Sequence, residues 1–411
     1  MTTWKLVIAF IRRRPFSWAL HVVTLAIGLT VVLALVQVER AAQARLTRDL
    51  AGVDLVVGAK GNPLQLVLSA VLQADAPTGN IPLAEAEKIA RSPLVKLAVP
   101  VSMGDSYRGA RIVGTTPDYL RLYGGKLAGG RTWAGPMEAV VGSDVARRLN
   151  LRIGKTFIGS HGLIDSGQQH DHAPYKVVGV LAPTGSVADR LILVDLASVW
   201  AVHGESEPAA DDHNHHHHDA EQAAALADRQ MTALLIQYRS PMAAVTLPAR
   251  VRATPDLQAA APPVEMARLL SLLGPGLSLL RALGAVLLGL AAAGFLIGLI
   301  GAVGQRRRDI ALLRALGMAP GRVFLLLTTE ALLLGLAGGV LGVTGARLLV
   351  FLGAGLAAPS LGGAGLAQPP MGAAELLTIM AAVGLALAAA AAPAWIASRS
   401  DPAQNLSGAQ A

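Results

Sequence analysis

The amino-acid sequence predicts a membrane protein with four transmembrane α-helices and an α+β extracytoplasmic domain inserted between spans 1 and 2. Three observations support this fold class. The 411 residues are 53% hydrophobic and only 15% charged, which is too apolar for an ordinary soluble protein. The apolar residues are concentrated in four runs, each near the ~20 residues that a helix needs to cross a bilayer. Between the first two runs, short β-rich segments mix with helical ones, and this mixture favours an α+β domain.

The predicted spans are the four apolar runs, residues 16–38, 277–304, 322–349 and 374–398. The first run is too long for a secretory signal peptide and lacks a small-residue cleavage site, so we interpret it as a retained anchor. Residues 1–15 before it predict an amphipathic helix at the membrane interface. One face of that helix carries Trp4, Val7, Ile8 and Ile11.

The cations at the span ends orient the chain, because cytoplasmic segments are enriched in lysine and arginine. The cations of one side are Lys5, Arg12, Arg13, Arg14, Arg306, Arg307, Arg308, Arg314, Arg322 and Arg399. The isolated span-edge cations of the other side, which includes the loop 350–373, are Arg281 and Arg347. We therefore expect a multi-pass protein of the inner (cytoplasmic) membrane with both termini, including the tail 399–411, in the cytoplasm.

Residues 39–276 form the predicted extracytoplasmic (periplasmic) domain, which at roughly 240 residues is large enough for one or two lobes. Residues 41–50 are expected to continue the first span outward as a helical stalk. Strands are expected at 53–57, 95–101, 110–114, 139–141, 175–181 and 191–194. Helices are expected at 82–90 and 144–149, the second opened by a Ser143/Asp144 cap.

A short amphipathic segment, residues 305–321, separates the second and third spans. Its apolar residues recur at helical spacing beside charged ones: Ile310, Leu313, Leu316 and Gly317, with Arg308, Asp309 and Arg314. A soluble helix held between two spans is suited to docking on a protein at the membrane face.

This segment and its continuation, RRRDIALLRALGMAPGRVFLLLTTEALLLGLAGG, resemble the coupling-helix region of the MacB/FtsX/LolC-like permeases. The inserted domain resembles the same family through ARIVGTTPDYLRLYGGKLAGGR, AVVGSDVARRLNLRIGKTF and YKVVGVLAPTGS, in that order. The ending PAWIASRSDPAQNL resembles the family's ending, so the resemblance covers nearly the whole chain.

The resemblance implies a permease subunit of an ABC transporter that works as a dimer, most simply a homodimer, on separate ATPase subunits that use ATP. It implies that ATP-driven motion passes through the coupling helix to the extracytoplasmic domain, for efflux or release of a lipoprotein, amphiphile, peptide or metal-related substrate. The residues expected to couple to the ATPase are Arg308, Asp309, Ile310, Leu312, Leu313, Arg314, Leu316 and Gly317.

No catalytic site and no intrinsic cofactor are predicted, so the chain is expected not to be an enzyme. Residues 58–61 lack the Ser/Thr and the lysine position of a phosphate-binding loop, and no nucleophile–base or paired-carboxylate constellation stands out. The absence of cysteine excludes disulfides and thiol catalysis. Nucleic acid is excluded as a partner because the cations lie at membrane edges and aromatic residues are scarce.

A histidine-rich loop, residues 203–221, is the strongest metal-binding signal in the sequence, because imidazole binds Zn²⁺ and neighbouring transition metals. The predicted ligands are His170, His172, His213, His215, His216, His217 and His218. A histidine tract is also a low-complexity segment that binds metal weakly in any context, so a passive loop is the competing interpretation. A periplasmic substrate-binding or metal-binding protein is a further expected partner.

Glu330 is an ionisable residue inside the third predicted span, where a charge is costly and should face protein or water. A gate or relay residue and an interhelical hydrogen bond are the two interpretations. Glycine pairs such as Gly335/Gly339 and Gly338/Gly342 offer faces for close helix packing, although glycine is common throughout. Two alternative functions remain at this point: a mechanotransmitter that transports nothing and regulates an extracytoplasmic hydrolase, and a metal-sensing membrane protein.

Overall fold

The computed structural model of the chain describes residues 3–13, 15–161, 174–203, 229–305, 307–357 and 372–399. The chain divides into two compact units. The helical unit comprises Met1–Ala42, Pro275–Ala357 and Gly365–Ala411, and the sheet unit comprises Gln43–Gly274 and Ala358–Ala364.

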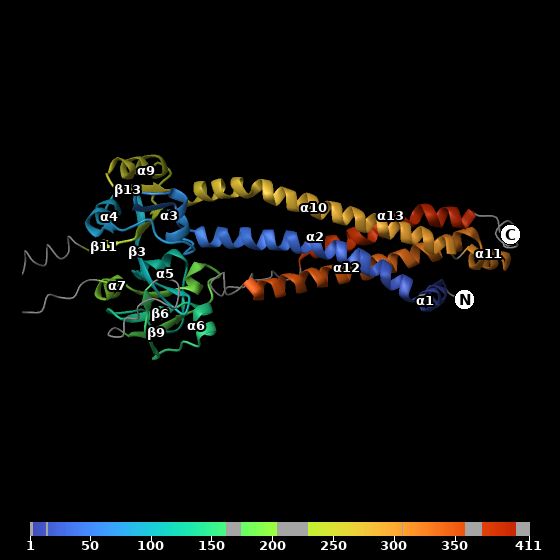
Figure 1. Cartoon of the computed structure of the whole chain (residues 1–411), viewed down its shortest axis with the longest axis horizontal. Helices are drawn as coiled ribbons and strands as arrows, with labels where there is room; N and C mark the ends of the chain where they lie inside the picture. Colours follow the sequence, from blue (N-terminus) through green and yellow to red (C-terminus); the bar gives the residue numbers. More distant parts are fainter. Residues whose placement is uncertain are drawn as a thin grey trace, which may run out of the picture. The chain divides into compact units, whose positions relative to one another are not determined.

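The helical unit confirms the predicted set of four transmembrane helices. Its elements are α1 (Thr3–Arg13), α2 (Pro15–Leu50), α10 (Pro262–Gln305), α11 (Arg307–Ala315), α12 (Pro320–Ala357) and α13 (Ala373–Arg399) (Figure 1). Helices α2, α10, α12 and α13 are long and apolar enough to cross a membrane. Helix α2 includes the predicted stalk, and α10 begins well before residue 277, so both contribute residues to both units. The limits of the membrane itself stay predictions.

Small residues of α12 allow two neighbouring helices to approach it closely. A Cβ atom built on Gly335 would lie 2.9 Å from the Cβ of Ala386 on α13. A Cβ on Gly342 would lie 2.7 Å from the Cβ of Leu29 on α2. Both distances are shorter than real Cβ contacts, so glycine is required at each position. The two glycine pairs seen in the sequence therefore serve different partners, because Gly335 and Gly339 face α13 whereas Gly338 and Gly342 face α2.

The sheet unit is built on one mixed sheet, whose described strands follow the order β13-β1-β12-β3-β4-β10-β6-β9-β5, with β7 beside β9 and β8 beside β3. Strands β4 and β10 are parallel, as are β6 and β9, and the other pairs are antiparallel. The strands of this sheet are β1 (Leu55–Ala59), β3 (Val95–Tyr107), β4 (Ala110–Thr115), β5 (Leu127–Gly130), β6 (Glu138–Val141), β7 (Thr156–Phe157), β8 (Ser160–His161), β9 (Tyr175–Leu181), β10 (Ile192–Asp195), β12 (Ala233–Tyr238) and β13 (Leu257–Ala260). A separate pair consists of β2 (Ile81–Pro82) and β11 (Gln230–Met231).

Helices and a 3₁₀ turn accompany this sheet: α3 (Pro63–Ala70), α4 (Leu83–Ala90), α5 (Asp118–Leu122), α6 (Ser143–Leu149), η1 (Val187–Arg190), α7 (Leu196–His203) and α9 (Ala243–Ala253). We call β13, β1, β12 and β3 the first half of the sheet, and β4, β10, β6, β9 and β5 the second half. Figure 1 shows α4 and α9 beside the first half and α6 and α7 beside the second.

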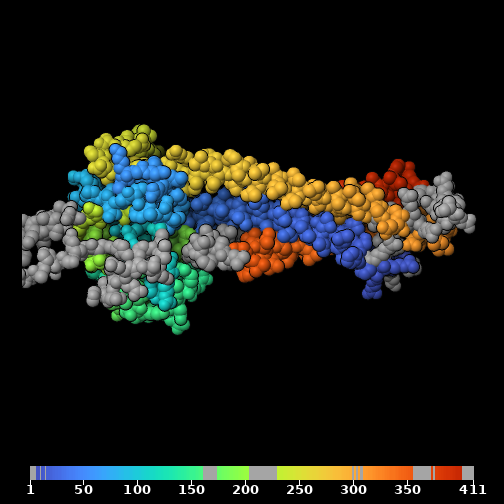
Figure 2. All heavy atoms as spheres, in the orientation of Figure 1, coloured from blue at the N-terminus to red at the C-terminus, as the bar shows by residue number. Residues whose placement is uncertain are grey.

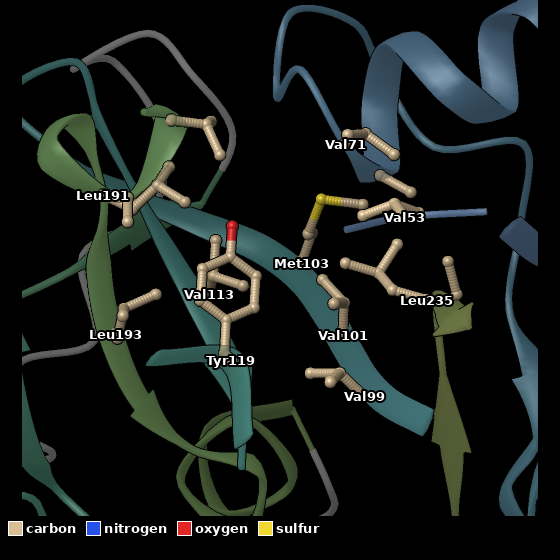
Figure 3. Close-up of a cluster of buried hydrophobic side chains, with 14 of the residues drawn as sticks. Val53, Val71, Val99, Val101, Met103, Val113, Tyr119, Leu191, Leu193 and Leu235 are labelled. Atoms are coloured by element: carbon tan, nitrogen blue, oxygen red, sulfur yellow. The ribbon is translucent and has the colours of Figure 1, made fainter. Parts of the chain in front are cut away.

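Alternation along the strands divides the core between the two faces of the sheet. One face carries a single cluster that runs through both halves, with Met103, Val113, Tyr119 and Leu193 among its members (Figure 3). The opposite face carries two separate clusters, one in each half. Leu46 and Leu50 of α2 and Met266 and Leu269 of α10 pack against the shared cluster. The parts of α2 and α10 that belong to the sheet unit therefore both pack on the face whose core joins the two halves.

The α+β character of the inserted domain is confirmed, and most predicted strands appear with shifted ends. Sequence reasoning missed β12, although its antiparallel pairing with both β1 and β3 makes it central to the first half. The predicted Ser143/Asp144 cap is wrong, because Gly142 is the N-cap residue of α6 and no side chain caps this helix. Gly142 is needed there, since a Cβ would lie 2.3 Å from the carbonyl oxygen of Ala188.

Candidate functional site

Helix α11 is fixed to the helical unit by one face. Ile310 is 3% exposed and Ala311 is also buried. Ile310 packs in a cluster with Val323 and Leu327 of α12 and with Ala394 and Ala397 of α13. This apolar contact holds the short helix against the two helices that follow it, so that α11 can move together with them.

The opposite edge of α11, continued by Leu316 directly after the helix ends at Ala315, is apolar and exposed. Leu312 is 52% exposed and Leu316 is 84% exposed, and one helical turn separates them. Leu313 and Arg314 are half-buried between the two faces, as is Asp309. An acid in the first turn is favourable beside the positive end of the helix dipole. The side chain of Arg308 lies outside the described residues.

The end of α11 is shaped by Gly317. The N–H of Gly317 donates to the carbonyl oxygen of Arg314 at 3.0 Å, and the N–H of Met318 donates to that of Leu313 at 3.0 Å. These two bonds form a Schellman motif, in which the residue after the helix adopts a left-handed conformation. Gly317 has a φ of 92°, a region that glycine enters without steric cost. Four of the eight predicted coupling residues thus have distinct structural positions: an anchor (Ile310), an exposed edge (Leu312 and Leu316) and a helix stop (Gly317).

Glu330 is buried in α12, with 7% of its surface exposed. The neighbouring hydroxyls of Thr328 and Thr329 donate to the carbonyl oxygen of Leu325, in their own helix. Both threonines therefore satisfy their hydroxyl protons locally. The relay and structural interpretations of Glu330 both stay predictions.

The two isolated span-edge cations have partners on neighbouring helices of the helical unit. Arg281 of α10 forms two hydrogen bonds with the carboxylate of Glu39 on α2, one of them 3.1 Å from Nε to Oε2. Arg347 of α12 donates to Oε1 of Glu375 on α13 at 3.0 Å, and the N–H of Gly372 donates to Oε2 at 2.9 Å. These pairs join α2 to α10 and α12 to α13 at positions that the sequence showed only as unpaired charges.

Sequence reasoning also missed a buried ion pair at the base of α2, within the sheet unit. Asp49 is 3% exposed, and Nη2 of Arg190 donates to its Oδ2 at 2.8 Å. The sequence carries a signal for Asp49, although none for its partner. Asp49 follows Leu46 on one helical face, and a carboxylate in the last turn of a helix opposes the helix dipole unless a cation compensates it.

The predicted metal ligands His170, His172, His213 and His215–His218 lie outside the described residues. In the part of the chain that the structure describes, no group of three or more histidine, cysteine, aspartate or glutamate side chains could hold a metal ion. The metal hypothesis stays a prediction from the sequence.

Comparison with known proteins places this chain in a family. The family model described as a MacB-like periplasmic core domain matches residues 18–254, and the model described as an FtsX-like permease C-terminal domain matches residues 279–402. No curated protein matches the chain.

Two solved structures resemble part of the chain. The periplasmic region of MacB from Actinobacillus actinomycetemcomitans is 10% identical, with a TM-score of 0.34, over 54% of this chain and 95% of that one. The extracellular domain of the noncanonical ABC-type transporter YknZ from Gram-positive bacteria is 14% identical, with a TM-score of 0.30, over 50% of this chain and 98% of that one. The assignment rests on the two family models, which together match most of the sequence: the chain belongs to the MacB/FtsX-like permeases, membrane components of ABC transporters that work with an ABC ATPase.

Proposed function

We propose that this permease receives ATP-driven motion from its ATPase partner through α11 and passes it along α2 and α10 to the sheet unit. The sheet unit then expels or releases a substrate outside the cytoplasm, with a lipoprotein, amphiphile, peptide or metal-related compound as the candidate classes. In this proposal the protein lies in the inner membrane, α11 and both termini face the cytoplasm, and ATP is hydrolysed by the partner alone.

The observation that carries this proposal is the division of α11 into two faces. Ile310 anchors the helix to α12 and α13, while Leu316 and Leu312 remain exposed. An anchored helix with an exposed apolar edge fits a groove on a partner, because burying that edge removes apolar surface from water. The Leu312–Leu316 edge is therefore the proposed contact with the ATPase.

Replacing the exposed residues Leu312 and Leu316 with aspartate should prevent the ATPase from binding the permease. Leu316→Asp, alone or with Leu312→Asp, is expected to abolish co-purification of the ATPase while membrane insertion stays normal, since neither side chain packs in the core. A matched control is Met242→Asp, which introduces the same charge at an exposed apolar residue of the sheet unit. ATPase recovery equal to wild type in the double variant would refute α11 as the docking element.

A second copy of the chain is the proposed partner of α10. The face of α10 that packs on α2 carries Gly284, Ala291 and Phe295. On the opposite face, exposed apolar residues follow a spacing of alternately four and three residues: Leu279, Leu283, Val286, Leu290, Ala293, Ile297 and Ile300. Side chains of α10 can be followed on the visible surface in Figure 2, in yellow to orange. This spacing is the one by which two helices pack along a common seam.

Disulfide cross-linking tests the second copy cleanly because the chain contains no cysteine. Leu279→Cys lies in the seam, whereas Ser278→Cys points about 100° away around the helix. Oxidation in native membranes should yield a cross-linked dimer from the first variant only. If neither variant cross-links, this face of α10 contacts lipid rather than a second copy. If both variants cross-link equally, two copies collide in the membrane without packing along a defined seam.

A further inference from the structure

The base of α2 is attached to the sheet unit in two different ways. Along the chain, α2 leads directly into β1, in the first half of the sheet. Gly52 makes this turn with a φ of 84°. Through its side chain, Asp49 instead reaches Arg190, the last residue of η1. Since η1 lies between β9 and β10, this contact connects α2 to the second half.

The contact is a buried and directional one. The side chains of Arg190 and Asp49 are 15% and 4% exposed, and Nη2 lies 2.8 Å from Oδ2. Arg45, one turn earlier in α2, approaches the same oxygen with its Nε at 3.9 Å. One guanidinium nitrogen of Arg190 thus bonds to one carboxylate oxygen of Asp49, and a charge-assisted hydrogen bond of this kind is stronger than a neutral one. The contact ties the base of α2 to η1 at this point.

The segment that carries Arg190 is itself held firmly in the second half. The carboxylate of Asp189 accepts hydrogen bonds from the N–H of Thr184 at 2.9 Å and from the N–H of Gly185 at 2.7 Å. Thr184 also donates through its hydroxyl at 3.0 Å. The N–H of Gly142, at the start of α6, donates to the carbonyl oxygen of Leu191 at 2.9 Å. Because of these hydrogen bonds, a displacement of Arg190 is expected to displace β9, β10 and α6 as well.

Stability alone does not account for this pair. Burial raises the pKa of Asp49, although Arg190 and Arg45 both act to lower it. Removal of the carboxylate from water therefore opposes the attraction that the two arginines supply. Apolar residues of similar volume often stabilise a fold as well as a buried ion pair does or better. Leu46 and Leu50, which flank Asp49 on the same side of α2, already supply such apolar contacts.

We propose that the Asp49–Arg190 pair is a positioning contact that makes the second half of the sheet unit follow α2. This proposal rests on the proposed function, because α2 is taken there as a carrier of the motion. Asp49 and Arg190 contact no substrate in this account. They act by holding η1, and with it α6 and the strands around it, in one orientation on the stalk.

Distances between spin labels in the permease–ATPase complex, reconstituted in lipid nanodiscs, test the proposal. Ala44→Cys on α2 is paired with Arg148→Cys on α6 to report on the second half. The same Ala44→Cys is paired with Arg250→Cys on α9 to report on the first half. All three side chains are exposed, and the chain has no native cysteine.

The expected result is selective. Asp49→Asn should broaden the distance distribution between α2 and α6 and leave that between α2 and α9 as narrow as in wild type. The control Glu138→Gln removes a charge from an ion pair of the second half that does not involve α2, and it should broaden neither. An unchanged α2–α6 distribution in Asp49→Asn would overturn the proposal, and so would equal broadening of both distributions.

Two further variants distinguish the loss of this contact from a general folding defect. Arg190→Lys keeps the charge and should retain a narrow α2–α6 distribution, whereas Arg190→Met should broaden it. If both variants lower the melting temperature equally yet leave the distribution narrow, the pair is only structural and the proposal fails.

A third label pair separates this proposal from the proposed function. Ser278→Cys on α10 with Arg148→Cys should show an ATP-dependent change in wild type, and Asp49→Asn should reduce or abolish it. Absence of any such change in wild type would refute the proposed transmission of motion. The α2–α6 distribution without nucleotide would then still decide whether Asp49 and Arg190 hold the second half to the stalk.

Discussion

Arginine–carboxylate pairs join distant segments of this chain, and burial decides what each pair contributes. Asp49 and Arg190 are almost fully enclosed, so desolvation dominates and burial raises the pKa of Asp49. Arg131 and Glu138 are more exposed, and there the hydrogen bond from Arg131 dominates and lowers the pKa of Glu138 to about 2. The N–H of Ala134 lowers it further. The arginine lowers the pKa of the carboxyl group in both pairs, and the degree of burial decides the net direction of the shift.

The Glu138 pair predicts a pH dependence of stability. The carboxyl pKa is lowered from 4.5 to about 2 on folding, so the stabilisation is fully present above pH 4.5 and is lost as the pH falls toward 2. Glu138→Gln should therefore lower the melting temperature of the purified chain modestly at pH 7. The melting temperatures of the wild-type and Glu138→Gln proteins, measured by thermal unfolding, should become equal as the pH falls from 4.5 toward 2. A difference that stays constant down to pH 2 would contradict the role of the charge.

At the scale of elements, α12 is organised by small residues on two faces. Gly335 and Gly339 face α13, while Gly338 and Gly342 face α2. Alanines of α13, including Ala382, complete the first contact. Helices in a membrane gain little from the hydrophobic effect and associate through close packing, so glycine at these positions brings the helix backbones together.

Filling one of these contacts should loosen the helical unit. Gly342→Val places new atoms against Leu29 and is expected to destabilise the protein by about 1–3 kcal/mol, as overpacking does. Gly353→Val is the matched control, because the same helix has open space there. Thermal unfolding in detergent should separate the two variants. Equal melting temperatures would show that α2 does not pack on α12 through Gly342.

At the scale of the whole molecule, a unit of membrane helices and a sheet unit share α2 and α10. Membership of the permease family, together with the four apolar helices, makes this a multi-pass membrane protein. The distribution of cations predicts the cytoplasm for α11 and the opposite side for the sheet unit, and this orientation stays a prediction.

Impermeant thiol labelling of intact cells tests this orientation. Gln73→Cys in the sheet unit should react from outside, whereas Gln305→Cys at the end of α10 should react only after the membrane is opened. The native chain gives no background because it has no cysteine. If Gln305→Cys is labelled in intact cells, the topology is the reverse of the predicted one, and α11 lies where a cytoplasmic ATPase cannot contact it.

The sequence by itself determined the four long helices, the mixed α/β insertion and the position of α11, because each depends on local composition and periodicity. It did not determine which faces of those elements would be covered. Ile310 and Leu316 are equally apolar in the sequence, and only contact with α12 and α13 buries the first and leaves the second exposed.

The same limit explains the missed residues. Asp49 and Arg190 are 141 residues apart, and β12 pairs with β1 across a still larger separation. Pairing over such separations depends on how the chain closes its loops around a shared core, and no local pattern records it. The tertiary structure alone therefore decided that a carboxylate of the stalk meets an arginine of the second half.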